Sequence, residues 1–243
     1  MDNTRANYRR LDPEKIVETV QTLQHRVDDR FPASGLGRVV TELRKVAEET
    51  IQRTGWIQKP HLPLRASAVL LSAVIVALLT GMLLNIRHFQ FEEYTNFIQA
   101  LEASISSVVF IGAAIVFLVN WENRIKRRRA LQAIHELRAL AHIVDMHQLT
   151  KDPENSFKPE PVPPTKKRGL TPFEFARYLD YCGDALALIS KIAALYVQDY
   201  PDTVILDAVD DVEDLTAGFS RKIWQKITIL ENLGRNLSPP EIR

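Results

Sequence analysis

Four polar residues that could carry chemistry lie close together in the middle of the chain, at His135, Arg138, His142 and Asp145. If this stretch is helical, steps of about 100° per residue place all four within one quadrant of its surface. Imidazole and carboxylate groups bind metal ions and move protons, and a guanidinium pairs well with phosphate. The spacing therefore raises the hypothesis of a metal site, or of a site for group transfer or hydrolysis.

The metal hypothesis depends on His142 and Asp145, which are three residues apart and could share one ion. His135 lies two turns away, so a second helix would have to complete the coordination shell. Arg138 lies between these residues and repels a cation. The sequence therefore favours a polar stripe that pairs with lipid phosphates or with acidic residues of another helix.

The tetrapeptide His135-Glu136-Leu137-Arg138 resembles the phosphoacceptor box of sensor histidine kinases. In that family a helical histidine is followed by glutamate, a hydrophobe and arginine, usually downstream of a two-span membrane hairpin. The resemblance implies that His135 accepts a phosphoryl group and that Glu136 helps to deprotonate it. Residues 139–141 lack the family's usual proline, and no glycine-rich ATP lid or asparagine box follows. The resemblance thus extends to a phosphotransfer helix without its kinase.

Two apolar segments precede this stretch and position it beside a membrane. Residues 66–86 and 104–121 carry no charged side chain. About 20 helical residues cross the roughly 30 Å of hydrocarbon in a bilayer. We therefore predict a transmembrane hairpin over residues 61–121, with the short loop 87–103 on the outside.

Basic residues near the ends of the two segments predict their orientation. Arg53, Lys59 and Arg65 precede the first segment, whereas the loop carries Arg87 alone. Because positive charge stays on the cytoplasmic side, both termini are expected in the cytoplasm of a multi-pass protein of a bacterial inner membrane.

The exit from the second segment carries a basic collar at the level of the lipid head groups. Each cation there is attracted to anionic lipid by about 1 kcal/mol. We predict lipid binding by five residues, namely Arg124, Lys126, Arg127, Arg128 and Arg129.

The remaining chain is expected to be helical outside the bilayer. Residues 1–60 form two amphipathic helices, the first capped by Asp12, and residues 122–150 continue the second span as a basic juxtamembrane helix. Residues 151–171 are a proline-rich linker, and residues 172–236 form an antiparallel hairpin of two long helices. Apolar residues recur every three or four positions along both of these helices, as they do in coiled coils.

An acidic row on the last predicted helix has a spacing that could hold a divalent ion. The row projects away from the apolar seam of that helix, and its position in the first half of the helix suits the helix dipole, as do basic residues in the second half. We interpret it as a solvated face that could meet the basic collar or Arg138. The acidic residues are Asp207, Asp210, Asp211 and Asp214, and the basic ones are Arg221, Lys222 and Lys226.

Composition narrows the classes of function. The chain has 31 Lys and Arg against 30 Asp and Glu, a balance that argues against nucleic-acid binding. Its single cysteine, Cys182, excludes an internal disulfide and a cysteine-cluster metal site. The sequence contains no phosphate loop, nucleophile elbow, zinc-protease helix or dinucleotide fingerprint, so no cofactor is expected.

These observations predict an all-α protein, with a two-span membrane hairpin and a cytoplasmic helical bundle or long antiparallel hairpin. They favour a non-enzymatic scaffold or regulator that contacts anionic lipid and associates with itself or with a protein partner. One alternative is a transfer, hydrolytic or phosphotransfer site at His135, Arg138, His142 and Asp145. Another is a homo-oligomeric pore, although neither span carries an ionisable residue to line it.

Overall fold

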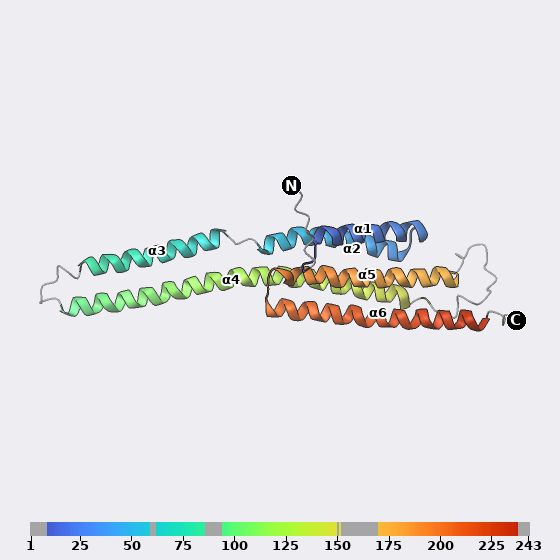
Figure 1. The fold of residues 1–243 in the computed structure, drawn as a ribbon. Helices are drawn as coiled ribbons and strands as arrows, with labels where there is room; N and C mark the ends of the chain where they lie inside the picture. The colour runs from blue at the N-terminus through green and yellow to red at the C-terminus, as the bar shows by residue number, and fades with distance from the viewer. Residues whose placement is uncertain (1–8, 59–61, 86–93, 150, 152–169, 238–243) are drawn as a thin grey trace. The chain divides into compact units, whose positions relative to one another are not determined.

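The computed structural model of the chain describes residues 9–58, 62–85, 94–149, 151 and 170–237. All regular structure in these ranges is α-helical, as the sequence predicted. Residues 87–93 of the expected external loop and residues 152–169 of the expected linker lie outside the described ranges. The helices are α1 (Pro13–Arg30), α2 (Gly35–Gln58), α3 (Leu62–Asn85), α4 (Tyr94–Leu149), α5 (Pro172–Gln198) and α6 (Thr203–Leu237) (Figure 1).

The helices group into two compact units. One unit combines residues 1–58 with residues 130–243, and the other comprises residues 59–129. The N-terminal helices and the C-terminal hairpin therefore share one unit, together with the end of α4. This larger unit is called the bundle below.

Side-chain caps begin three of the bundle helices where the sequence signals them. Oδ1 of Asp12 accepts hydrogen bonds from the backbone N–H groups of residues 14 and 15, which α1 would otherwise leave unpaired. Thr171 and Glu174 form a capping box at α5. Asp202 accepts from the N–H of Val204 (3.1 Å) and so begins α6.

The core of the bundle is centred on α5, which packs against α1, α2 and α6. The expected apolar stripe of α5, from Phe175 to Tyr196, is buried, and a second stripe beside it is buried as well. A helix that is apolar over so much of its circumference must be covered on several sides. The second stripe consists of Tyr178, Tyr181, Ala185, Leu188, Ile192 and Leu195.

The end of α4 completes the bundle between α2 and α6. Its buried residues Ile134, Leu137 and Val144 belong to the same hydrophobic core as α5. Glu136 forms an ion pair with Arg53 of α2, and the ring of His142 lies edge-on to Phe219 of α6 with 5.5 Å between centroids. The predicted contact between this helix and the C-terminal hairpin is therefore present.

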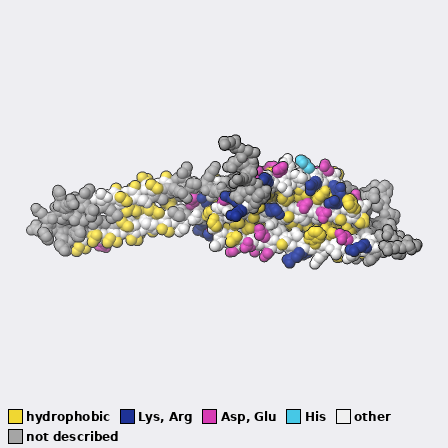
Figure 2. Space-filling model, in the orientation of Figure 1, with side chains coloured by type: hydrophobic (Ala, Val, Ile, Leu, Met, Phe, Trp, Pro, Cys, Tyr) yellow, Lys and Arg dark blue, Asp and Glu magenta, His cyan; other side chains and the backbone are white. Residues whose placement is uncertain are grey.

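The second unit contains α3 and the first part of α4, and large apolar side chains cover its visible surface (Figure 2). Leu70 of α3 is 67% exposed and Phe110 of α4 is 75% exposed. Among the described helices, one is long and apolar enough to cross a membrane, and it lies within Ile105–Leu149. The expected second span, over residues 104–121, therefore falls on a helix that is long and apolar enough to cross a membrane. The span over residues 66–86 stays a prediction.

Two identical substitutions test whether α5 is the core of the bundle. Leu186 is fully buried, so Leu186→Ala should lower the free energy of unfolding by about 2–5 kcal/mol through lost burial and a cavity. Leu149→Ala removes a leucine that is 61% exposed and should change it by less than about 0.5 kcal/mol. Urea unfolding of the full chain in mild detergent, followed by circular dichroism, measures both. Equal losses would contradict the central position of α5.

Candidate functional site

The four residues of the predicted polar stripe all lie on α4, but they do not converge on a common point. His135, Arg138 and His142 are exposed, whereas Asp145 is buried. Arg138 approaches Asp211 of α6, with 3.8 Å between Nη1 and Oδ2, so the acidic row meets the stripe at this residue. In the described part of the chain, His135 makes no hydrogen bond or ion pair.

The buried Asp145 takes part in a structural cap at the end of α4. Its Oδ1 accepts a 2.6 Å hydrogen bond from Nε2 of Gln148, which is fully buried. Nζ of Lys226 donates to the backbone carbonyl of Gln148 (2.8 Å), one of the carbonyls that a helix end leaves unpaired. Asp145 is thus engaged along its own helix, and the described residues contain no group of three His, Cys, Asp or Glu side chains that could hold a metal.

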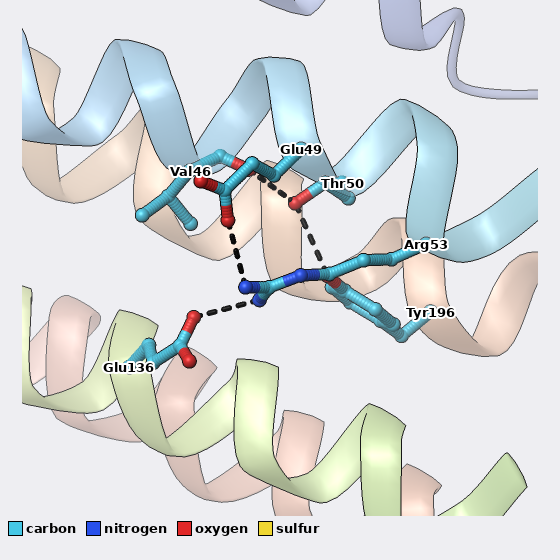
Figure 3. Close-up of polar contacts among 6 residues, drawn as sticks. All are labelled: Val46, Glu49, Thr50, Arg53, Glu136 and Tyr196. Carbon is cyan, nitrogen blue, oxygen red and sulfur yellow. Dashed lines mark hydrogen bonds and ion pairs between the residues drawn. The ribbon is translucent and has the colours of Figure 1, made fainter.

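A second polar cluster, absent from the sequence-based predictions, joins α2, α4 and α5 (Figure 3). The guanidinium of Arg53 lies between two carboxylates, 2.7 Å from Glu49 of its own helix and 2.6 Å from Glu136 of α4. Deeper in the core, the hydroxyl of Thr50 donates to the carbonyl of Val46 and lies 3.2 Å from the hydroxyl of Tyr196 of α5. We call these residues the Arg53 cluster.

The Arg53 cluster fixes the register of three helices. Arg53 and Glu136 are each about one-third exposed, so water screens their attraction and their ion pair contributes little to stability. Burial raises the pKa of Tyr196, while the hydrogen bond between Tyr196 and Thr50 and the charge of Arg53 oppose that rise. Tyr196 therefore stays protonated at neutral pH and serves as a hydrogen-bonding group in the core. Because Glu136 is held by Arg53, it is directed to α2 and pairs with no other described residue.

His147, near the end of α4, lies against the start of α2. Its ring contacts Gly35 so closely that a Cβ built on Gly35 would come within 2.3 Å of Cε1 of His147. Burial lowers the pKa of His147, and the nearby cations Arg38 and Lys151 lower it further. The neutral imidazole therefore packs against the backbone at Gly35, and a larger residue there would have to displace the ring.

Cys182 is fully buried on the seam of α5, as the sequence predicted for a small hydrophobe. Burial raises the pKa of its thiol to about 12, despite the opposing charges of Lys151 and Lys226. A thiol is nucleophilic only as the thiolate, so Cys182 is unreactive at neutral pH.

The basic collar divides into exposed and buried members. Arg124, Arg128 and Arg129 are exposed, and Arg127 is partly exposed. Lys126 is buried, and its Nζ lies 2.8 Å from a carboxylate oxygen of Glu122 one turn earlier. Lys126 is thus neutralised within its own helix, and lipid binding by the collar stays a prediction.

An open groove of about 1160 Å³ runs between α1 and α5. Its walls carry both signs of charge. Arg26 and Lys191 lie near Asp184, whose pKa is raised by burial and by Asp180 while these cations oppose the rise. Since the opposite charges neutralise one another, the groove has no preference for a charged ligand.

Comparison with known proteins provides no relative for this chain: no family model, no curated protein and no solved structure matches it.

A pair of glycine substitutions tests the packing of His147. Gly35→Ala should lower the free energy of unfolding by about 1–3 kcal/mol, because the added methyl group displaces the imidazole. Gly183→Ala in α5 is the control; its Cβ meets nothing within 4 Å, so it should be neutral or stabilise by up to about 1 kcal/mol.

The double variant Gly35→Ala/His147→Ala separates the contact from other effects. If the clash is the cause, Gly35→Ala should cost much less in this background than in the parent chain. An equal cost in both backgrounds would contradict the predicted contact.

The buried thiol predicts a loss of stability in alkali. The folded chain retains the Cys182 proton to about pH 12, whereas the unfolded chain releases it near the ordinary pKa of 9.0. Above pH 9 the unfolded state therefore binds fewer protons, and stability falls as pH rises. Relative to Cys182→Ala, which lacks this proton, the parent should lose up to about 1.4 kcal/mol for each pH unit. Urea unfolding of both chains over a pH series measures this, and parallel curves would contradict it.

Proposed function

We propose that this chain is a membrane-anchored helical scaffold or regulator, whose bundle acts through helix–helix contacts with itself or with a protein partner. The enzyme hypothesis finds less support, because the polar stripe of α4 neither converges nor borders a described pocket. The bundle offers long exposed helix faces instead, and such faces are suited to protein contacts.

The observation that carries the proposal is the dual character of α4. Its first part exposes apolar side chains, among them Val109 at 63% and Phe117 at 59%. After residue 130 the same helix buries Ile134 and Leu137 in the bundle core. Exposed apolar residues at this density require lipid, whereas the buried ones require protein. This change along one helix supports a lipid-facing segment that continues into the bundle.

The finer topology forms part of the proposal. The chain crosses the membrane twice, through residues 66–86 and 104–121, and both termini lie in the cytoplasm of a bacterial cell. The exposed large side chains of α3, including Val69 and Leu70, support a second lipid-facing helix. The exposed arginines at 124, 128 and 129 support contact with anionic head groups.

The mass of the purified chain tests the proposal. We expect the full-length protein in mild detergent to have the mass of two or more copies, or to retain a stoichiometric partner. Light scattering gives the mass of the protein component, and mass spectrometry after cross-linking in intact membranes identifies any partner. A monomer that cross-links to nothing would contradict a scaffold.

The triple variant His135→Ala/Arg138→Ala/His142→Ala is the matched control for the enzyme hypothesis. All three side chains are exposed, so their removal should leave the fold intact. Under our proposal the variant keeps the parent's assembly and complements a deletion strain as well as the parent does. Loss of complementation with unchanged assembly would favour a transfer site instead.

A further inference from the structure

The outer face of α6 carries charges that are ordered along the helix. Its inner face is buried by residues such as Val212 and Ile223. On the opposite side, exposed residues follow one another every three or four positions, with acidic residues first, a small residue in the middle and a basic residue after it. This outer face consists of Asp207, Asp210, Asp214, Ala217 and Arg221.

The charges of the outer face have no partners among the residues that the structure describes. Asp207, Asp210, Asp214 and Arg221 make no hydrogen bond or ion pair in the described structure. Asp214 and Arg221 cannot pair with each other, because seven residues separate them by about 10 Å along the helix axis. Asp211, at the edge of the face, is the acidic residue that meets Arg138 of α4.

The helix dipole does not account for this order. Its effect falls off within the first and last turns of a helix. Because α6 extends from Thr203 to Leu237, Asp210 and Asp214 lie beyond the first turn, and Arg221 is near the middle. A partner outside the chain explains the central charges better than the dipole does.

We propose that the outer face of α6 binds the same face of a second copy, with the two helices antiparallel and crossing near Ala217. Asp214 and Arg221 lie about 5 Å on either side of the midpoint between residues 217 and 218. Antiparallel pairing places each of them opposite the other residue of the second copy, which makes two equivalent ion pairs. Such self-complementarity is the property of a two-fold symmetric interface.

The residues at the crossing point permit close approach. Ala217 is exposed, and a Cβ built on Gly218 would meet nothing within 4 Å, so no large side chain separates the two backbones. Trp224 lies beside the face and is 66% exposed. An exposed tryptophan next to small residues is a typical anchor of a helix interface.

The charge order also selects the direction of pairing. Parallel helices would place the acidic halves against each other, and like charges at an interface cost several kcal/mol. Antiparallel helices bring Asp214 of each copy against Arg221 of the other, while Asp207 and Asp210 meet the uncharged Thr228 and Gln225. The inference deepens the proposed scaffold function and rests on it, because it assigns the self-association to one surface.

A cysteine at the crossing point tests the inference. In an antiparallel pair the two copies of residue 217 face each other near the symmetry axis, so Ala217→Cys should form a disulfide-linked dimer on mild oxidation with copper phenanthroline. Ala187→Cys, at an exposed alanine of α5, is the matched control and should give about tenfold less dimer. The native Cys182 is buried and does not interfere. Equal cross-linking at both positions would overturn the inference.

Charge reversals in the Ala217→Cys chain provide a second test. Asp214→Arg and Arg221→Asp should each lower cross-linking about tenfold, because like charges then meet across the interface. The combined reversal restores opposite charges and should restore cross-linking. If the charges served only the helix dipole, the combined reversal would not restore cross-linking, because both of its charges would oppose the dipole. Circular dichroism verifies that each variant remains helical.

The membrane from which the second copy comes is determined by mixing two proteoliposome populations, one of which carries an epitope tag. Cross-links within one population indicate pairing in one bilayer, and cross-links between populations indicate pairing of opposed bilayers; both support the surface. If the parent is dimeric by light scattering while Ala217→Cys does not cross-link, the surface is wrong and the scaffold proposal stands. A strictly monomeric parent with no partner overturns both.

Discussion

The bundle depends on the burial of one helix, α5. Thirteen of its residues are buried, and they cover two adjoining stripes rather than one. Each large apolar side chain that leaves water contributes about 1.5–3 kcal/mol, so an uncovered α5 would be strongly unfavourable. The pair α1–α2 and the helix α6 together supply the required cover. The two ends of the chain are therefore joined by a shared core.

Polar groups within this core specify alignment more than they add stability. The Arg53 cluster connects α2, α4 and α5 through one partly exposed ion pair and one buried pair of hydroxyls. A buried hydroxyl that loses its partner costs about 1–3 kcal/mol, so a shifted helix would be penalised. At the other end of α4, Lys226 caps the final carbonyls and Gln148 binds Asp145. Two polar contacts thus hold this helix at both ends of its buried part.

Local signals in the sequence predicted the helices and the contact of α4 with the C-terminal hairpin, but they did not predict which polar residues pair between helices. Asp12, Thr171 and Asp202 cap helices because short side chains reach nearby N–H groups whatever the rest of the fold does. The pairing of Arg53 with Glu136 depends on how two distant helices align, and no local pattern encodes that. The second stripe of α5 also recurs every three or four residues, so its spacing alone does not distinguish it from a solvent-facing side. The polar stripe of α4 was correctly placed on one helix, yet the burial of Asp145 depended on packing.

The position of α5 in the chain has a consequence for biosynthesis. The apolar faces of α1 and α2 emerge first from the ribosome, and residues 59–171 are made before their partner helix follows. Through that interval the faces of α1 and α2 that pack against α5 lack their cover, so they remain exposed to water and to chaperones. A chain arrested before α5 is made would leave the N-terminal hairpin without this cover, and quality-control proteases can recognise such exposed apolar surface as a mark of incomplete synthesis.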